Sequence, residues 1–188
     1  MQYSYATVTD ASFLSMTADQ AAPRLLGWQL LSEMAGQRAE IAITEVEAYR
    51  SDDPASHSFG GPRGRNVVMF ERPGLLYVYR SYGIHWCANV VCGGVGVGSA
   101  ILLRAGRPIS GSDIMERRRG RTTNLTSGPG NLCQALGIDG SHNALDLFDA
   151  TSPIRLQAGP PPAKIEVTRR IGISKAVETP WRFLAVGG

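Results

Sequence analysis

The chain has 188 residues, 43% of them hydrophobic and 19% charged, and its formal net charge is +3. A chain of this length and composition can bury one good hydrophobic core. It shows no apolar run near the roughly 20 residues that a membrane-spanning helix needs. We therefore expect residues 1–188 to form a single domain that has no membrane partner.

Two further features bear on the compartment and on what holds the chain together. Residues 1–13 lack the basic start and the apolar run of a signal peptide, so we expect an intracellular, cytoplasmic protein. The 3 cysteines are odd in number and show no paired C-x-x-C spacing. This argues against a disulfide framework and against a cysteine zinc site.

The N-terminal part of the sequence predicts a helix and then two strands. Thr17 or Asp19 can cap a short helix that runs to residue 26, and Gly27 ends it. Residues 28–31 and 39–49 follow with strand-like composition, joined by a turn that contains a glycine.

The second of these strands carries carboxylates within an apolar stretch. If it alternates without interruption, one face carries Ile41, Ile43, Glu45, Glu47 and Tyr49. A carboxylate is rarely buried without a partner, because its removal from water costs several kcal/mol. Either Glu47 is a buried functional group, or Glu45 and Glu47 lie beyond the end of the buried patch. The pattern leaves both readings open.

A long loop and a tyrosine-rich hairpin come next. Residues 50–65 are rich in Asp, Ser, Gly and Pro, and loops of this length in compact domains tend to be functional or disordered. Residues 75–80 and 84–91 predict two strands, and the turn between them has Gly83 for its unusual backbone angle. Tyr82 lies at the tip, either as a stacking wedge or as a ring folded back on its own hairpin.

The remaining chain predicts further strands and short helices. Residues 93–98 form a glycine-rich hairpin loop, which leads into a strand over 100–105 and lacks the features of a phosphate-binding loop. Helices are predicted over 108–119 and 129–136. Residues 159–162 are a proline-rich turn between two closing strands. Strands and hairpins interrupted by short helices indicate an α+β fold rather than a βαβ alternation.

Several short segments stand out in this order: EVEAY (45–49), ASHS (55–58), RNVVMF (65–70), PGLLYVY (73–79), YGIHWCAN (82–89), LLRA (102–105), GPGNLCQAL (128–136) and RIGI (170–173). At these spacings the chain resembles the alkyladenine (3-methyladenine) DNA glycosylases, in a bacterial form, from about residue 22 to residue 183. The resemblance implies a single domain built on a curved, mostly antiparallel, open barrel-like sheet. Short helices flank this sheet, and the tyrosine hairpin protrudes from it.

The resemblance implies an enzyme that flips alkylated or deaminated purines out of duplex DNA and hydrolyses their N-glycosidic bond, which starts base excision repair. Such hydrolysis needs a carboxylate to activate water and to offset the positive charge that develops on the sugar. Glu47 matches the family's general base, and Arg104 matches an arginine that positions the water. Ile171 matches a position whose backbone carbonyl also holds the water. No metal and no cofactor is implied.

The resemblance also assigns residues that hold the flipped base. Tyr49 would stack on one side of it, and His57 and Tyr79 on the other. Asn89 would crowd the exocyclic amino group of guanine and so exclude that base. Judged without the resemblance, Tyr79 is an ordinary cross-strand aromatic residue and His57 is a loop histidine.

The expected partner is double-stranded DNA that contains damaged purines, bound by a monomer. By the resemblance, Tyr82 enters the base stack from the minor groove, with Ile84 and His85 beside it. Arg63 and Arg65 are candidates for contacts with the DNA backbone.

Some features depart from the family pattern. Where many relatives have Thr-Pro, this chain has Arg63 followed by glycine, so we expect the loop to contact DNA differently. We also expect contacts from a longer C-terminal tail to be missing, since the chain stops soon after Phe183.

The lysines bear on the type of glycosylase. The only lysines are Lys164 and Lys175, and neither falls in a matched segment. Glycosylases that also cut the strand use an amine to form a Schiff base. We therefore expect a monofunctional enzyme that leaves the DNA backbone intact.

Other functions stay open. A nucleic-acid-binding module would keep Tyr82 and the arginines but would not need Glu47 and Asn89. A metal-dependent hydrolase would use Asp52, Asp53, His57 and His85, although their spacing matches no metal motif. A glycosylase fold that acts on free nucleosides would not need the hairpin tip.

Overall fold

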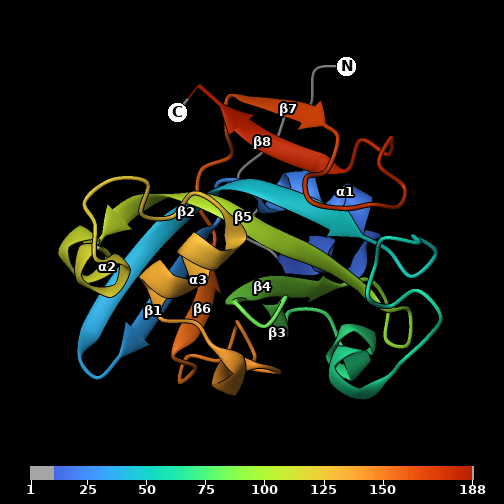
Figure 1. The fold of residues 1–188 in the computed structure, drawn as a ribbon, viewed down its shortest axis with the longest axis horizontal. Coiled ribbons are helices and arrows are strands. Elements are labelled where there is room, and N and C mark those ends of the chain that lie inside the picture. The colour runs from blue at the N-terminus through green and yellow to red at the C-terminus, as the bar shows by residue number, and fades with distance from the viewer. Residues whose placement is uncertain (1–10, 188) are drawn as a thin grey trace.

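A curved antiparallel β-sheet dominates the computed structural model, which describes residues 11–187 (Figure 1). Its strand order is β3-β4-β5-β2-β1-β6, and β8 pairs with both β2 and β7. The strands are β1 (Gln29–Met34), β2 (Gln37–Tyr49), β3 (Leu76–Ser81), β4 (His85–Cys92), β5 (Ser99–Ser110), β6 (Ile154–Gln157), β7 (Lys164–Thr168) and β8 (Arg182–Val186). The expected α+β class is confirmed.

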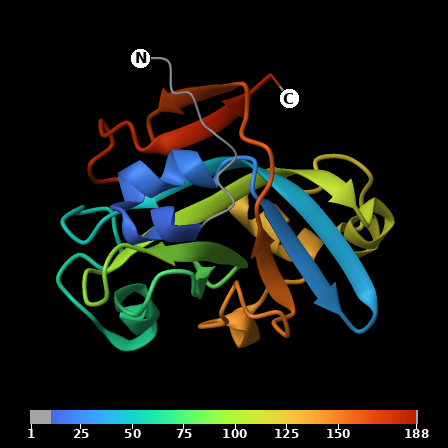
Figure 2. The same ribbon diagram turned by 180° about the vertical axis from the view of Figure 1, so that it is seen from behind.

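Short helices flank the sheet on opposite sides. The α-helices are α1 (Ala18–Leu25), α2 (Ser112–Arg119) and α3 (Pro129–Leu136), and the 3-10 turns are η1 (Ala11–Ser15), η2 (Gly64–Phe70) and η3 (Gly140–His142). Helix α3 is nearer the viewer in Figure 1, and α1 in Figure 2. Within residues 11–187, none of the helices has the length and apolar character that crossing a membrane requires.

Helix α1 forms because its apolar residues repeat at helical spacing. Ala18, Ala21, Ala22 and Leu25 are fully buried, so they cover one face of the helix and join the main hydrophobic core. Thr17 occupies the predicted cap position in an extended conformation, but its side chain makes no capping hydrogen bond, and the helix ends at Leu25, one residue earlier than predicted. The residues on which the signal-peptide expectation mostly rests, 1–10, lie outside the described part of the chain.

Strand β2 lies in the middle of the sheet, and its regular alternation is interrupted. The pairing with β5 shifts register between Ile43 and Val46. A β-bulge of this kind inserts an unpaired residue and reverses which face the following side chains occupy. Ile41 and Ile43 lie in the core before the bulge, and Val46 lies in the core after it. Glu47, which follows Val46, is therefore on the opposite face of the strand, where it contacts Ile171. The expectation that Ile41, Ile43, Glu45, Glu47 and Tyr49 all share one face is therefore wrong.

The helix predicted over 108–119 begins later than expected. Strand β5 continues to residue 110, with Pro108 opposite Ile41 and Ser110 opposite Glu40, and α2 starts only at Ser112. Proline is tolerated here because β4 pairs with β5 only as far as Leu102, which leaves this part of β5 at a sheet edge. The helix predicted over 129–136 is confirmed at its predicted bounds.

The hairpin of β3 and β4 turns tightly, as predicted. Ile84 donates its N–H to the Ser81 carbonyl at 2.9 Å. Both residues between them have positive φ, 49° at Tyr82 and 68° at Gly83, as in a type I′ turn. The sequence indicated this backbone angle for the glycine but not for the tyrosine, in which it is uncommon.

Candidate active site

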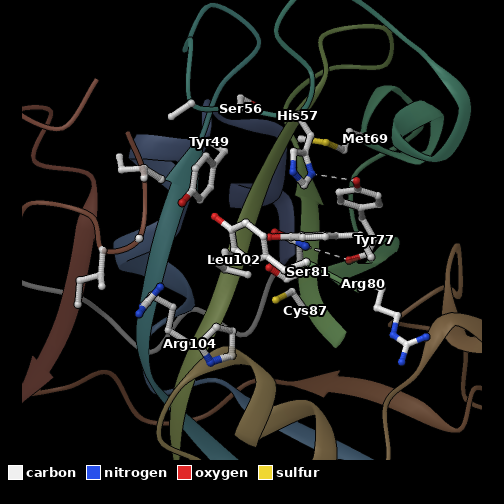
Figure 3. A pocket seen from close by; sticks show the side chains of 18 of the residues that line it. Tyr49, Ser56, His57, Met69, Tyr77, Arg80, Ser81, Cys87, Leu102 and Arg104 are labelled. Carbon is white, nitrogen blue, oxygen red and sulfur yellow. Dashed lines mark hydrogen bonds between the residues drawn. The ribbon is translucent and has the colours of Figure 1, made fainter. Parts of the chain in front are cut away.

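An open cavity of about 670 Å³ lies where β2, β3, β4 and β5 come together with two loops. Figure 3 shows Tyr49, His57, Tyr77 and Arg104 around it. The loop after β2 supplies His57, and the segment between β7 and β8 supplies residues 171–175. Most residues predicted for the site line this cavity: Tyr49, Arg65, His57, Tyr79, Tyr82, His85, Asn89, Arg104 and Ile171.

Glu47 is fully buried beside this cavity, and both of its carboxylate oxygens accept hydrogen bonds. Oε1 accepts from the backbone N–H of Ile171 at 2.8 Å and lies 3.3 Å from Nη1 of Arg104. Oε2 accepts from the Tyr49 hydroxyl at 2.9 Å. Glu47 therefore does not lie beyond the buried patch, and its burial is compensated by these donors.

Tyr49 acts as a hydrogen-bond donor in this arrangement. Burial first, and then the neighbouring Glu47 carboxylate, raise the pKa of Tyr49 well above its usual range. Its hydroxyl therefore keeps its proton and points it at Glu47. This leaves the face of the ring available to the cavity.

Arg104 connects two carboxylates of the same strand. Its Nε donates to Glu45 Oε1 at 2.8 Å, and Arg182 Nε donates to the same oxygen at 2.7 Å. Burial alone would lower the pKa of Arg104, but the attraction of Glu47 and the hydrogen bond to Glu45 raise it. For Glu45, burial opposes ionisation, yet hydrogen bonds from Arg182 and Arg104 lower its pKa. Arg104 is thus held as a cation beside Glu47.

Aromatic rings form the wall of the cavity opposite Tyr49. The ring centroids of His57 and Tyr79 are 4.4 Å apart at 77°, and those of Tyr77 and Tyr79 are 5.6 Å apart at 27°. The Tyr77 hydroxyl lies 3.1 Å from Nδ1 of His57 (Figure 3). A flat, apolar ring can enter between such walls and stack on them.

His57 lies in a positively charged environment. Burial first, and then the charge of Arg65, lower the pKa of His57 below its ordinary value. The Arg65 guanidinium lies 5.6 Å from the centroid of the Tyr79 ring. Arg65 thus borders the cavity, whereas Arg63 is exposed and donates to the Gly60 carbonyl at 2.9 Å.

Asn89 lies on β4, lines the cavity and is only 5% exposed. Its Nδ2 donates to the Tyr77 carbonyl at 3.0 Å. This bond fixes the orientation of the amide, because a buried amide group needs partners for its polar atoms. The polar residue within an apolar strand is therefore explained by a cross-strand contact.

The side chains at the hairpin tip are strongly exposed. Tyr82 is 89% exposed and Ile84 is 69% exposed. The tip is therefore not folded back on the hairpin, so that reading of Tyr82 is wrong. His85, at the start of β4, packs closely against Gly130 of α3, where even a methyl group would lie 2.9 Å from the His85 side chain.

The structure also brings to the site residues to which the sequence assigned no part in it. Asn66 is buried and donates from Nδ2 to the His57 carbonyl at 2.7 Å, while its Oδ1 accepts the Arg63 N–H. Tyr77 supports His57 and Tyr79. Lys175 lines the cavity although it lies outside every matched segment. Asn66 and Tyr77 do lie in matched segments, which was the only available signal for them.

The residues suggested for a metal-dependent hydrolase are not arranged as metal ligands, although His57 and His85 line the same cavity. Asp52 is bound by Arg50 at 2.8 Å, Asp53 is bound by Arg170, and His57 contacts Tyr77. Within residues 11–187, no group of three or more His, Cys, Asp or Glu side chains is arranged to hold a metal ion.

Comparison with known proteins gives a consistent picture. The sequence model of the family described as methylpurine-DNA glycosylase matches residues 12–188. A protein of Rhodopseudomonas palustris (strain BisB18) is 51% identical over 92% of this chain and 84% of its own length. One of Mycolicibacterium fortuitum is 52% identical over 87% of this chain and 86% of its own length. A protein of Agrobacterium fabrum is 46% identical over 97% of this chain and 91% of its own length. All three carry the provisional name 3-methyladenine DNA glycosylase.

Proposed function

The chain belongs to the methylpurine-DNA glycosylase family, which makes it a DNA N-glycosylase of the 3-methyladenine type, and from this premise we propose that it flips alkylated or deaminated purines out of duplex DNA and excises them by hydrolysis. The observation that carries the proposal is the buried Glu47 carboxylate, which is held by three donors beside an aromatic-walled cavity.

In the proposed reaction, Glu47 is the general base. A water molecule beside the carboxylate loses its proton to Glu47 as its oxygen bonds to the anomeric carbon, while the bond to the purine nitrogen breaks. The sugar passes through a state of oxocarbenium character, which the negative charge of Glu47 stabilises. Arg104 orients Glu47 and the water, and the backbone of Ile171 completes the same site.

The aromatic walls supply the binding energy for the flipped base. Flipping costs a few kcal/mol in lost stacking and pairing. Stacking between Tyr49 on one side and His57 with Tyr79 on the other offsets this cost. Asn89 lines the same cavity, and its fixed amide would clash with the exocyclic amino group of guanine.

The exposed hairpin tip is the proposed wedge. Tyr82 enters the space that the flipped nucleotide leaves, with Ile84 and His85 against the minor groove. Arg63 and Arg65 are proposed to contact the DNA backbone, Arg65 from the rim of the cavity. We propose that the protein works as a monomer in the bacterial cytoplasm, where its DNA substrate is found.

The proposed enzyme is monofunctional, although Lys175 lines the cavity. The absence of a borohydride-trappable complex with lesion DNA is the expected result. If a complex forms in the wild type and not in Lys175→Ala, the enzyme also cuts the strand through an amine.

The decisive experiment is single-turnover excision from duplexes that carry one hypoxanthine or one ethenoadenine. Glu47→Gln should lose about 10²- to 10⁴-fold in rate, the range typical of a general base, and still bind lesion DNA. Glu40→Gln is the matched control, because Glu40 is also buried on β2 but binds Arg38 and Ser110. EDTA should leave the rate unchanged. A wild type that binds both lesion duplexes and methylated DNA but releases no base would support the binding-module alternative.

A further inference from the structure

A buried ion pair lies directly behind the cavity, among residues to which no part in excision has been given above. The side chains of Arg170 and Asp53 are 0% and 1% exposed. Arg170 binds Asp53 with both terminal nitrogens, Nη1 to Oδ2 and Nη2 to Oδ1, the latter at 3.1 Å. A buried ion pair stabilises a fold little more than apolar side chains of similar volume would. Stability alone therefore does not explain why this pair lies here.

The same guanidinium reaches the end of β2, next to Glu47. Its Nη1 donates to the Ala48 carbonyl at 3.0 Å. Its Cζ lies 4.7 Å from the centroid of the Tyr49 ring and 5.4 Å from that of Trp181. Arg170 thus contacts both the backbone between Glu47 and Tyr49 and the ring that donates to Glu47.

The next residue binds the Glu47 carboxylate itself. The N–H of Ile171 donates to Glu47 Oε1 at 2.8 Å. Two consecutive residues of the segment after β7 are therefore attached to two consecutive residues of β2, Arg170 to Ala48 and Ile171 to Glu47. The Ile171 side chain is 49% exposed, so its own packing contributes little to holding this N–H in place.

Arg170 also spans the cavity wall that follows it. Its Nη2 reaches the Ala176 carbonyl at 3.5 Å, and residues 171–175 between these two points all line the cavity. These residues belong to no strand or helix. Their conformation thus depends on contacts with neighbouring segments, and Arg170, which precedes residues 171–175, also contacts the Ala176 carbonyl that follows them.

We propose that Arg170 and Asp53 are positioning residues for excision. The ion pair holds the Ile171 N–H on Glu47, the Tyr49 ring beside it, and the wall of residues 171–175 around the base. Neither side chain touches the base or the sugar. The inference rests on the proposed function and adds to it residues that act through Glu47 and Tyr49.

The test compares the rate of excision with binding of the lesion duplex. Arg170→Gln and Asp53→Asn should lower the single-turnover rate on a hypoxanthine duplex about 10- to 100-fold, as expected when a reacting group is displaced by a fraction of an ångström. The dissociation constant for the same duplex should change less than the rate does, because the hairpin tip and the arginines that bind the DNA outside the cavity remain in place. Arg170→Lys keeps the charge but not the two-pronged geometry, so it should recover only part of the rate.

Two further variants make the result specific. Arg169→Gln removes the neighbouring ion pair between Arg169 and Glu178, in which the two side chains are 68% and 71% exposed. This variant should excise at the wild-type rate. The double variant Arg170→Met with Asp53→Leu replaces the pair by apolar side chains and should fold, as thermal melting can check, but excise slowly. Folded variants that excise at the wild-type rate would overturn the proposal. The proposal would also be overturned if the rate and the binding of the duplex fell equally, or if a smaller fraction of active enzyme accounted for the whole loss of rate. If the wild type releases no base, the proposed function fails, and this inference fails with it.

Discussion

The backbone N–H of Ile171 donates to Glu47 Oε1 at 2.8 Å, although the two residues are 124 positions apart in the sequence. This bond joins the segment after β7 to the middle of the sheet. Since the proposed base is completed by a backbone group, substitutions of the Ile171 side chain should matter little. The predictions below therefore address the side chains around it.

Arg104 should be more important for excision than its neighbour Arg182. Both donate to Glu45 at 2.7–2.8 Å, but only Arg104 also contacts Glu47. We expect Arg104→Gln to lower the single-turnover rate about 10- to 100-fold by removing the group that orients Glu47 and the water. Arg182→Gln, which disturbs the same network from the other side, should change it much less. Equal losses in the two variants would contradict the assigned role.

Tyr82→Gly should separate stability from activity. The tyrosine has φ of 49° and is 89% exposed. Glycine removes a left-handed backbone penalty of about 1 kcal/mol, so the free energy of unfolding in urea should stay the same or rise. Excision from duplex DNA should fall, because nothing then fills the gap in the stack. A single-stranded substrate is the control, and excision from it should be unaffected.

His57 should titrate below its ordinary pKa of 6.5, because burial and then Arg65 lower that value. In Arg65→Gln, the NMR titration midpoint of His57 should move upward towards 6.5. A midpoint that stays unchanged or falls would show that Arg65 does not act on this ring.

The same shift has a consequence for stability. Between the folded and unfolded pKa values, the unfolded chain binds more protons at this site than the folded chain does. His57 should therefore lower the free energy of unfolding as the pH falls below about 6.5, and have no such effect above it. His57→Gln should remove part of this acid sensitivity, which urea unfolding at several pH values can measure.

Asn66→Ala should destabilise the loop that carries His57. The amide of Asn66 is 5% exposed and is the partner of the His57 carbonyl and of the Arg63 N–H. Removing it leaves buried polar groups unpaired, at a cost of about 1–3 kcal/mol in the free energy of unfolding. Gln157→Ala, at an exposed position of β6, is the control and should change stability by less than about 0.5 kcal/mol. If Gln157→Ala lowered the free energy of unfolding as much as Asn66→Ala does, or if only Gln157→Ala lowered it, this account would be contradicted.

Much of the fold was predictable from local patterns. The turn at Tyr82 and Gly83, the helix over 129–136 and the position of α1 follow from turn residues, a proline at the first helical turn and the spacing of apolar residues. Each of these signals acts over a few neighbouring residues, so a single segment contains the whole of it. Predictions that depend on which strands pair were less accurate. The helix α2 begins at Ser112, later than predicted, because β5 continues along β2 to Ser110.

The site divides in the same way. By itself the sequence determined which side chains are present and in which local segments, and its resemblance to a family indicated that Glu47, Tyr49, His57 and Arg104 belong together. Only the tertiary structure decided that a bulge in β2 turns Glu47 away from Ile41 and Ile43, that Ile171 donates to Glu47, and that Arg170 binds Asp53 across 117 positions. No local period records such contacts, because they depend on strand register and on the meeting of distant segments.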